Sequence, residues 1–459
     1  MFNIKFARLL VGVVCTLLTA NAYTDKFSDD ASGLLAKYIS VDTVNPPGNE
    51  SNGVDFFAEI FDKAGVPFES AESAPGRGNI WAVIRGGDKP GLVLLHHMDV
   101  VPANKKYWET DPYSGVIKEG YVYGRGALDT KGLGILHLQA FLALKASNVK
   151  PSRDVWFVAT ADEEAGGLFG AGWLQDNRPE IFSDVGYLIN EGGSGRVYGD
   201  SSVFLIETTQ KVPLWLRLTA SGNPGHGSSP QTETSVTRLL RAGDKIANTQ
   251  FETHVIDPVQ AMFHGMAPYS SENFRQANLD IRTASRDPKF MKRLQLENPS
   301  SAALLRNTCS ITRLQGSAKI NVVPAEVMME LDCRLLPDQS PEDFTRQLAE
   351  LINDENIRIE TLISFSPAVS GVETPLYRAL GRVLQQAYPG VAVVPSVSTG
   401  FTDSHFFRDA GIASYGFSPL LLPLMDFRGI HGNNERVSVE NMQRGVQVMR
   451  ELLNDFVTE

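Results

Sequence analysis

Three segments of this 459-residue chain share a pattern in which an apolar run ends abruptly in acidic or histidine residues. They are GLVLLHHMDVVPA (91–103), VWFVATADEEAGG (155–167) and DVGYLINEGG (184–193). Between the first two, KGLGILHLQAFLALKA (131–146) is apolar on most faces, which predicts a buried helix. Buried strands that alternate with helices indicate an α/β fold with a mixed, largely parallel sheet. Sites in such sheets form at the carboxyl ends of the strands, where all three polar clusters fall.

A second pattern begins near residue 209. Its predicted elements are a strand VPLWLRLTAS, a helix ETSVTRLLRAGDKIA, strands CSITRL and NVVPAEVMMELDCRLL, a helix SPEDFTRQLAELIND and a strand IRIETLISF. The order β-α-β-β-α-β is typical of a ferredoxin-like α+β unit. An insertion near residues 250–306, predicted to be helical in part, interrupts this order.

The α/β character returns after this unit, with PLYRALGRVLQQAY and a terminal helix. We therefore predict one α/β domain formed by residues 23–208 and 367–459, split by an inserted lid domain of residues 209–366. The chain length agrees, because a single core rarely grows to this size.

The first 22 residues have the layout of a secretory signal peptide. Lys5 and Arg8 precede an apolar run from Leu9 to Leu18, and a small-residue cleavage site ends at Ala22. The run is short for a membrane span, although an uncleaved anchor is the alternative. We expect an exported protein, periplasmic or secreted, that keeps no stable membrane span after cleavage.

Net charge and cysteine content limit the partners and the compartment. The formal net charge of −11 argues against nucleic acid or an anionic membrane as a partner. Export would leave two cysteines, Cys309 and Cys333, which could form a disulfide in an oxidising compartment. The sequence leaves open whether their geometry permits the bond.

The polar clusters combine imidazoles with carboxylates. His97 and Asp99 lie two residues apart, so both point the same way on an extended segment, and an acid behind a ligating imidazole fixes its orientation. Imidazole and carboxylate ligands suit zinc, cobalt or manganese. A carboxylate that bridges two such ions would relieve the repulsion among the crowded acids at 162–164.

Each of these residues also has a simpler explanation. Acids after strands are often helix caps or solvated loop residues. We expect His96 and His137 to be packing residues, and His254 and His264, in the insertion, have no recognisable spacing. Chance is nevertheless a weak explanation for HxD, DTKG, DEE, NEGG and HGNNE in this order.

With these motifs, the sequence resembles the two-zinc metallopeptidases that include acetylornithine deacetylase, succinyl-diaminopimelate desuccinylase, aminoacylase and the glutamate-releasing carboxypeptidase. The resemblance covers nearly all of the predicted mature chain. The segment ALLRNTCSITRLQGSAKINVVPAEVMMELDCRLLPDQSPEDF and the long insertion are most similar to the carboxypeptidase S and N-acyl-amino-acid hydrolase branch.

The resemblance implies a metal centre with two zinc ions per chain, for which cobalt or manganese could substitute. Asp129 would bridge the two ions. The remaining implied ligands are His97 and Glu191 for one ion, and Glu164 and His431 for the other. Asp99 would support His97.

The resemblance also implies the reaction. Glu163 resembles the general base, which would take a proton from the attacking water and pass it to the leaving nitrogen of an amide. The third acid, Asp162, is expected to be structural. The expected substrate is an N-acyl amino acid or a small peptide with a free carboxylate.

The lid is expected to supply substrate contacts. His226 matches the family histidine that helps to bind the carbonyl oxygen. In several members this histidine comes from the neighbouring subunit, which implies a homodimer through the lid. Asn321 and Arg334 match substrate-contacting positions, and Arg334 suits a carboxylate. The segment GFTDSHFF contains Thr402, predicted to bind substrate, but has His405 where relatives often have arginine.

Two other classes of function stay open. One is a dipeptidase or aminopeptidase with the same metal centre. The other is a non-catalytic binding protein on this scaffold, against which the retention of Glu163 argues, because a binding protein needs no base.

Overall fold

The computed structural model describes residues 26–458, so the predicted signal peptide lies outside the described residues. These residues form two compact units. The first comprises the chain up to Ile206, Gly371–Val393 and the residues from Ala410 onward. The second comprises Glu207–Ser370 and Val394–Asp409. Within residues 26–458, no helix is long and apolar enough to cross a membrane.

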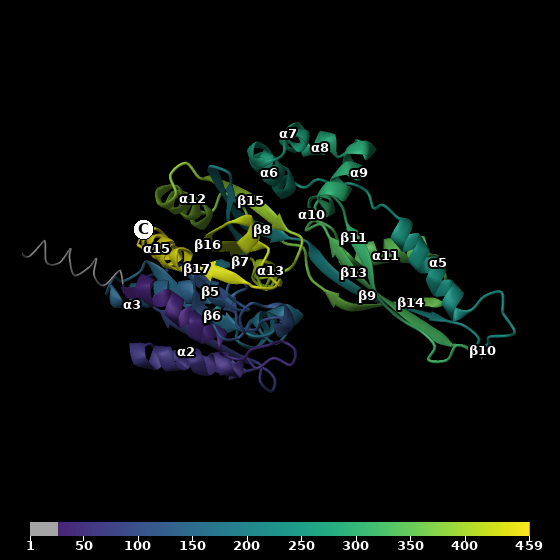
Figure 1. The fold of residues 1–459 in the computed structure, drawn as a ribbon, viewed down its shortest axis with the longest axis horizontal. Helices are drawn as coiled ribbons and strands as arrows, with labels where there is room; N and C mark the ends of the chain where they lie inside the picture. The colour runs from purple at the N-terminus through teal and green to yellow at the C-terminus, as the bar shows by residue number, and fades with distance from the viewer. Residues whose placement is uncertain (1–25, 459) are drawn as a thin grey trace, which may run out of the picture. The chain divides into compact units, whose positions relative to one another are not determined.

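The largest sheet has eight strands and a parallel centre (Figure 1). Strand β3 pairs in parallel with β6 and β7, and β7 pairs in parallel with β16, whereas β1, β2 and β8 run antiparallel to their neighbours β2, β6 and β7. The predicted mixed α/β fold class is confirmed. In sheet order, the strands are β1 (Phe68–Glu72), β2 (Gly78–Ile84), β6 (Arg153–Thr160), β3 (Lys89–His97), β7 (Val185–Tyr198), β16 (Ala413–Leu422), β8 (Ser201–Gln210) and β15 (Ala392–Ser398).

Four helices share the main hydrophobic core with this sheet: α2 (Ser51–Ala64), α3 (Lys131–Ala146), α12 (Pro375–Ala387) and α15 (Val439–Val457). Helix α3 is buried along most of its length, as predicted. It approaches β3 closely at Gly134, where an added Cβ would lie 2.3 Å from the ring of His96. A glycine inside a helix costs about 1 kcal/mol relative to alanine, so it is retained here for the close contact.

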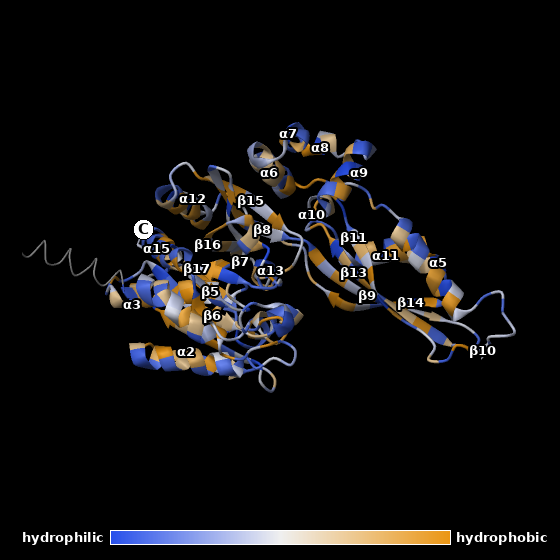
Figure 2. Ribbon diagram, viewed as in Figure 1, coloured by the Kyte–Doolittle hydropathy of each residue, from blue (hydrophilic) through white to orange (hydrophobic). Residues whose placement is uncertain are grey.

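The second unit contains a four-stranded antiparallel sheet, β11 (Thr308–Gln315), β13 (Glu326–Leu335), β9 (Val212–Ser221) and β14 (Ile357–Ser364), in that order. Helices α5 (Ser235–Asn248) and α11 (Pro341–Ile352) bury apolar residues in the same core as the strands. In Figure 2, hydrophobic and hydrophilic stretches alternate along α5, as expected for a helix that buries one side. In chain order these elements read β-α-β-β-α-β.

The segment between α5 and β11 is helical and forms a small hydrophobic core that also includes Val397 of β15. Its helices are α6 (Asp257–Met266), α7 (Glu272–Leu279), α8 (Ile281–Ala284), α9 (Pro288–Glu297) and α10 (Pro299–Ala303). Lys211 ties the end of this segment to β9, because its ammonium donates to the carbonyls of Ala303 and Arg306 and to the hydroxyl of Thr308.

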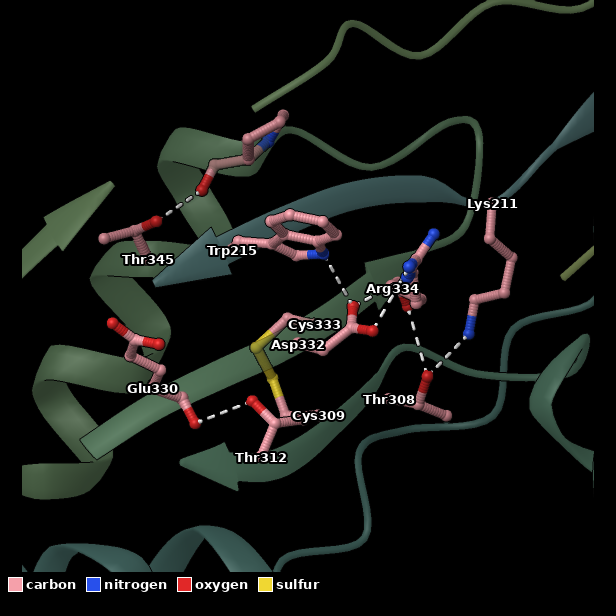
Figure 3. Close-up of a disulfide and its surroundings, with 11 residues drawn as sticks. Lys211, Trp215, Thr308, Cys309, Thr312, Glu330, Asp332, Cys333, Arg334 and Thr345 are labelled. Atoms are coloured by element: carbon pink, nitrogen blue, oxygen red, sulfur yellow. Dashed lines mark hydrogen bonds and ion pairs between the residues drawn. A yellow bond between two sulfur atoms is a disulfide. The ribbon is translucent and has the colours of Figure 1, made fainter. Parts of the chain in front are cut away.

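Cys309 and Cys333 form a disulfide, which the sequence had left open (Figure 3). The two residues are direct partners in the antiparallel register of β11 and β13, with Cα atoms 4.0 Å apart. The bond therefore fastens an edge strand of the second unit's sheet to its neighbour.

Candidate metal centre

Five segments of the first unit bring the predicted ligands together. His97 ends β3, and Glu163 and Glu164 form the short turn η2 (Glu163–Ala165) after β6. Asp129 lies two residues before α3. Because β3 and β6 are parallel neighbours, their carboxyl ends meet at one edge of the sheet.

Glu191 differs from the expectation that it would end its strand. Strand β7 continues through Glu191 to Tyr198. The register with β16 shifts between Gly416 and Ser418, opposite this part of β7, and the second half of β7 also pairs with β8. The end of the apolar run predicted the end of the strand. The strand continues because β16 and β8 provide backbone partners beyond Glu191.

Asp129 holds the centre of the cluster. Its Oδ1 lies 3.1 Å from Nε2 of His97, and its Oδ2 lies 3.1 Å from Nε2 of His431. Glu164 Oε1 lies 3.1 Å from the same His431 nitrogen, and Glu191 Oε1 lies 3.5 Å from Nε2 of His97. The two oxygens of one carboxylate thus face two imidazoles, each of which has a second acid beside it.

Glu163 lies at the edge of this arrangement. Its Oε2 is 3.9 Å from Nε2 of His97, and the residue is only 5% exposed. Among the described residues, His97, Asp129 and Glu164 form one set that could hold a metal ion, and His97, Glu163 and Glu191 form another. Geometry therefore permits Glu163 to act as a base or as a ligand, and its role stays a prediction.

Asp99 connects the histidine to the acidic turn. Nδ1 of His97 lies 2.9 Å from the backbone oxygen of Asp99 and 3.4 Å from its Oδ1. The carboxylate of Asp99 accepts the backbone N–H groups of Glu163 and Glu164, both at 3.1 Å. One buried acid therefore orients His97 and positions both glutamates.

The pKa shifts within the cluster reflect an excess of acidic groups over histidines. Hydrogen bonds to Asp129 and Glu164 raise the pKa of His431 to about 10. Although burial opposes its charge, the carboxylates of Glu191 and Asp129 hold the pKa of His97 well above its usual value. Burial and the charge of Asp129 raise the pKa of Glu191 to about 7. The crowded carboxylates therefore favour positive charge among them, as expected of donors arranged around cations.

The nitrogen and oxygen donors fit divalent ions such as zinc, cobalt or manganese. Asp129 is oriented as a bridging carboxylate would be, and Glu164 and Glu191 complete the two sides. These residues are candidate metal ligands.

A polar network that no motif indicated holds the acidic turn from behind. Arg77 Nη1 donates to Glu50 Oε1 at 2.6 Å, and its Nη2 lies 3.2 Å from Asp162 Oδ1. Nη2 also donates to Asn45, whose amide donates to Asp99. Asp162 has a positive φ of 69°, and its side chain is held in this network, which agrees with the structural role expected of it.

The predicted lid residues fall into two places in the second unit. His226 lies on β10 (Gly225–His226), which pairs with β12 (Val322–Val323). Asn321 is its neighbour, because the backbone N–H of Gly227 donates to the Asn321 carbonyl at 2.9 Å. His226 is exposed, and its Nδ1 lies 2.7 Å from the hydroxyl of Ser228.

Arg334 and Thr402 lie elsewhere in this unit. The guanidinium of Arg334 pairs with both oxygens of Asp332, at 2.7 and 3.1 Å (Figure 3). Its Nη1 is buried and finds no hydrogen-bond partner within residues 26–458. Thr402 is buried, and its hydroxyl donates to Gln210 Oε1 at 3.1 Å.

His405 is a buried, stacked side chain. Its ring lies 3.7 Å from that of Phe365 at an interplanar angle of 17°. Burial lowers the pKa of His405 to about 3, and the nearby Arg408 charge adds to this effect. A neutral imidazole in this position cannot replace an arginine that pairs with a carboxylate.

Comparison with known proteins decides the family. Residues 93–455 match the sequence profile described as Peptidase family M20/M25/M40. The chain belongs to this family. The predicted resemblance is confirmed, and the predicted enzyme class, a metal-dependent amide or peptide hydrolase, is confirmed at the level of the family.

Relatives of this M20 protein include N-acyl amino acid hydrolases. The chain is 30% identical to mouse N-fatty-acyl-amino acid synthase/hydrolase PM20D1 over 392 residues, covering 82% of this chain and 76% of the relative. It is 27% identical to human aminoacylase-1 over 431 residues, covering 92% and 93%.

Solved structures with the same fold include a carboxypeptidase and a dipeptidase. The M20 metallo-carboxypeptidase Sso-CP2 from Sulfolobus solfataricus aligns with a TM-score of 0.70 at 19% identity, covering 92% of this chain and 98% of that one. Human carnosine dipeptidase 1 aligns with a TM-score of 0.64 at 19% identity, covering 96% and 98%.

Proposed function

We propose that this M20 protein is an exported two-metal hydrolase that cleaves the amide bond of an N-acyl amino acid or of a small peptide with a free carboxylate. The observation that carries the proposal is the position of the Asp129 carboxylate between two histidines. Its two oxygens face His97 and His431, each with a further acid beside it.

Each residue then has a role. The bound metal ions would supply the Lewis acidity that activates water and polarises the amide carbonyl. The carboxylate of Glu163 takes the proton of the attacking water and delivers it to the leaving nitrogen. Asp99 keeps His97 in position and holds the backbone of the turn that carries Glu163.

The substrate class is supported by the relatives and by Arg334. N-acyl amino acids are named in the description of the PM20D1 relative and carry a free carboxylate. Arg334 has one unpartnered nitrogen with which to recognise that carboxylate. The buried, neutral His405 adds no positive charge to this recognition.

A dipeptidase is the second candidate, favoured by the fold shared with human carnosine dipeptidase 1. A panel of N-acyl amino acids with short and long acyl chains, dipeptides and amino-blocked dipeptides distinguishes the two. Metal content is measured on the same samples, with Glu163→Gln as the inactive control. Cleavage of only free-amine dipeptides would overturn the N-acyl assignment, and full activity of metal-free protein would overturn the whole proposal.

Export is supported by the Cys309–Cys333 disulfide, because such bonds persist in oxidising compartments. The protein recovered outside the cytoplasm should have its N-terminus near Tyr23, which N-terminal sequencing measures. Recovery of the full-length chain inside the cytoplasm would contradict this part of the proposal.

The homodimer is supported by the distance between two lid residues. His226 lies opposite Val322 of β12, which precedes the first residue of β13, Glu326, by four positions, whereas Arg334 lies near the end of β13. The strand between Glu326 and Arg334 spans about 26 Å at roughly 3.3 Å per residue. One small substrate cannot contact both ends of the same lid. A His226 contributed by a second copy, together with Arg334 of the first, removes this difficulty.

Mixing two inactive variants tests the dimer. Co-refolded Glu163→Ala and His226→Ala chains should recover part of the activity, because one hybrid site holds both an intact base and an intact histidine. Neither variant should recover when refolded alone. A mixture that stays inactive, or a monomer in sedimentation at the assay concentration, would refute the shared site.

A further inference from the structure

Glu435 is a buried acid that contacts the backbone of the candidate metal centre. It is fully buried and lies four residues after His431, in a segment without regular secondary structure. Its Oε1 accepts the backbone N–H groups of Leu128 at 2.7 Å and of Asp129 at 3.2 Å. Its Oε2 accepts Arg125 Nη1 at 2.6 Å and the N–H of Gly126 at 3.3 Å. Both oxygens are therefore occupied by N–H donors, so Glu435 has no lone pair directed at a metal.

Arg125 completes a connection between the two ligand-bearing loops. Its Nη1 pairs with Glu435, and its Nη2 donates to the carbonyl of Gly432 at 2.9 Å. Gly432 directly follows His431, which has a positive φ of 55°. One guanidinium thus contacts the His431 loop, while its partner carboxylate contacts the Asp129 loop.

The same two chain segments pair just outside this contact. Strand β17 (Arg436–Ser438) is antiparallel to β5 (Tyr121–Tyr123), with Arg436 opposite Tyr123. The Gly124 N–H donates to the Glu435 carbonyl at 2.9 Å. Pairing therefore continues from the strands into the Arg125–Glu435 contact and stops at the ligands themselves.

We propose that Glu435 and Arg125 are positioning residues that fix Asp129 and His431 relative to each other, so that one carboxylate can serve both metal positions. The proposal rests on the function proposed above. Burial of a carboxylate and a guanidinium is unfavourable unless both are paired and hydrogen-bonded, as they are here. Partners of this kind behind metal ligands typically change metal affinity by about 10- to 100-fold.

A matched control exists in the second unit. Arg408 and Glu207 form a pair of the same kind, with side chains 2% and 0% exposed and a shortest distance of 2.7 Å. The side chains of Arg125 and Glu435 are 3% and 0% exposed, and their shortest distance is 2.6 Å. Glu435→Gln places an amide N–H against donors that need an acceptor, and Glu207→Gln does the same at the control pair. Both variants lose a buried charge pair, and the Arg125–Glu435 pair is the one that hydrogen-bonds to the loops carrying Asp129 and His431.

The test measures metal binding by the folded, full-length protein. Metal-free wild type, Glu435→Gln and Glu207→Gln are titrated with Zn²⁺ by calorimetry, with melting temperatures recorded in parallel and Co²⁺ absorption spectra as a report on ligand geometry. We expect both variants to melt lower than wild type, and only Glu435→Gln to bind Zn²⁺ about 10- to 100-fold more weakly with an altered Co²⁺ spectrum.

The outcomes separate a positioning role from a structural one. Zn²⁺ affinity in Glu435→Gln equal to that of Glu207→Gln would overturn the inference and leave the proposed function standing. A wild type that binds no Zn²⁺ would overturn both. If Glu435→Gln does not fold, Arg125→Lys decides, because lysine keeps the charge but cannot contact Glu435 and Gly432 together. Unchanged affinity in that variant would also overturn the inference.

Discussion

Addition of Zn²⁺ to the metal-free protein is expected to release protons into the buffer. A histidine must be neutral to bind a metal ion, and both candidate histidine ligands hold protons when no metal is present. Contacts with Asp129 and Glu164 raise the pKa of His431 to about 10, and the surrounding carboxylates hold the pKa of His97 well above its usual value. Glu191, with a pKa of about 7, must also lose its proton to bind a metal.

The number of protons follows from these values. At pH 8, His431 carries close to one proton and Glu191 about 0.1, so these two residues should release about one proton per chain when both positions fill, and the raised pKa of His97 adds to this release. At pH 6, Glu191 is mostly protonated, and the release from these two residues should rise to about two. Lowering the pH by one unit should therefore weaken the apparent metal affinity of a position about tenfold for each proton displaced there.

Calorimetric titration with Zn²⁺ in buffers of different ionisation enthalpy measures this release directly. The slope of observed enthalpy against buffer enthalpy gives the number of protons at each pH. A slope near zero at pH 8 would refute the reasoning, because it would mean that the imidazoles are already neutral in the metal-free protein.

The stability of the metal-free protein should vary with pH in the opposite sense to its metal affinity. Because the folded-state pKa of His431 is raised from about 6.5 to about 10, its pairing stabilises the fold fully below pH 6.5. That contribution declines as the pH rises and is lost above about pH 10. Chemical denaturation of chelator-treated protein between pH 6 and 10 should show a declining free energy of unfolding.

Three further predictions concern single sites. Glu163→Gln should keep the metal content of wild type and lose about 10²- to 10⁴-fold in turnover, and loss of metal together with activity would exchange its role with that of the neighbouring acid. Asp129→Ala should weaken both metal positions and His431→Ala mainly one, so identical single-site losses in calorimetry would exclude a bridge. Reduction of the Cys309–Cys333 disulfide, whose cysteines are 24 residues apart, should lower the free energy of unfolding by about 3 kcal/mol in the chain-entropy account, and an unchanged melting temperature would contradict this.

The sequence by itself determined the fold class, and the family resemblance of its motifs implied the candidate ligands. Apolar runs that end in polar residues fix both which strands are buried and which end of each strand carries chemistry, and that information is local. The family resemblance carried by the HxD and DTKG motifs then implied His97 and Asp129 as ligands before their 3.1 Å contact was known. The same resemblance, through the DEE and HGNNE motifs, implied Glu164 and His431 without any knowledge of their distance.

Tertiary structure alone decided how the candidate ligands are held. Asn45, Arg77 and Glu435 act through partners far away in the chain, and Glu435 contacts residues more than 300 positions before it. No local spacing encodes such a contact. The continuation of β7 beyond Glu191 was hidden for the same reason, because a strand ends where its neighbours stop pairing.

The disulfide shows the same division. The sequence supplied two cysteines and a compartment in which they could react, but a bond requires Cα atoms within about 7 Å of each other. Only the register of β11 against β13 places Cys309 opposite Cys333, at 4.0 Å. Residue chemistry is written in the sequence, whereas the distance between two side chains depends on the folded path of the chain between them.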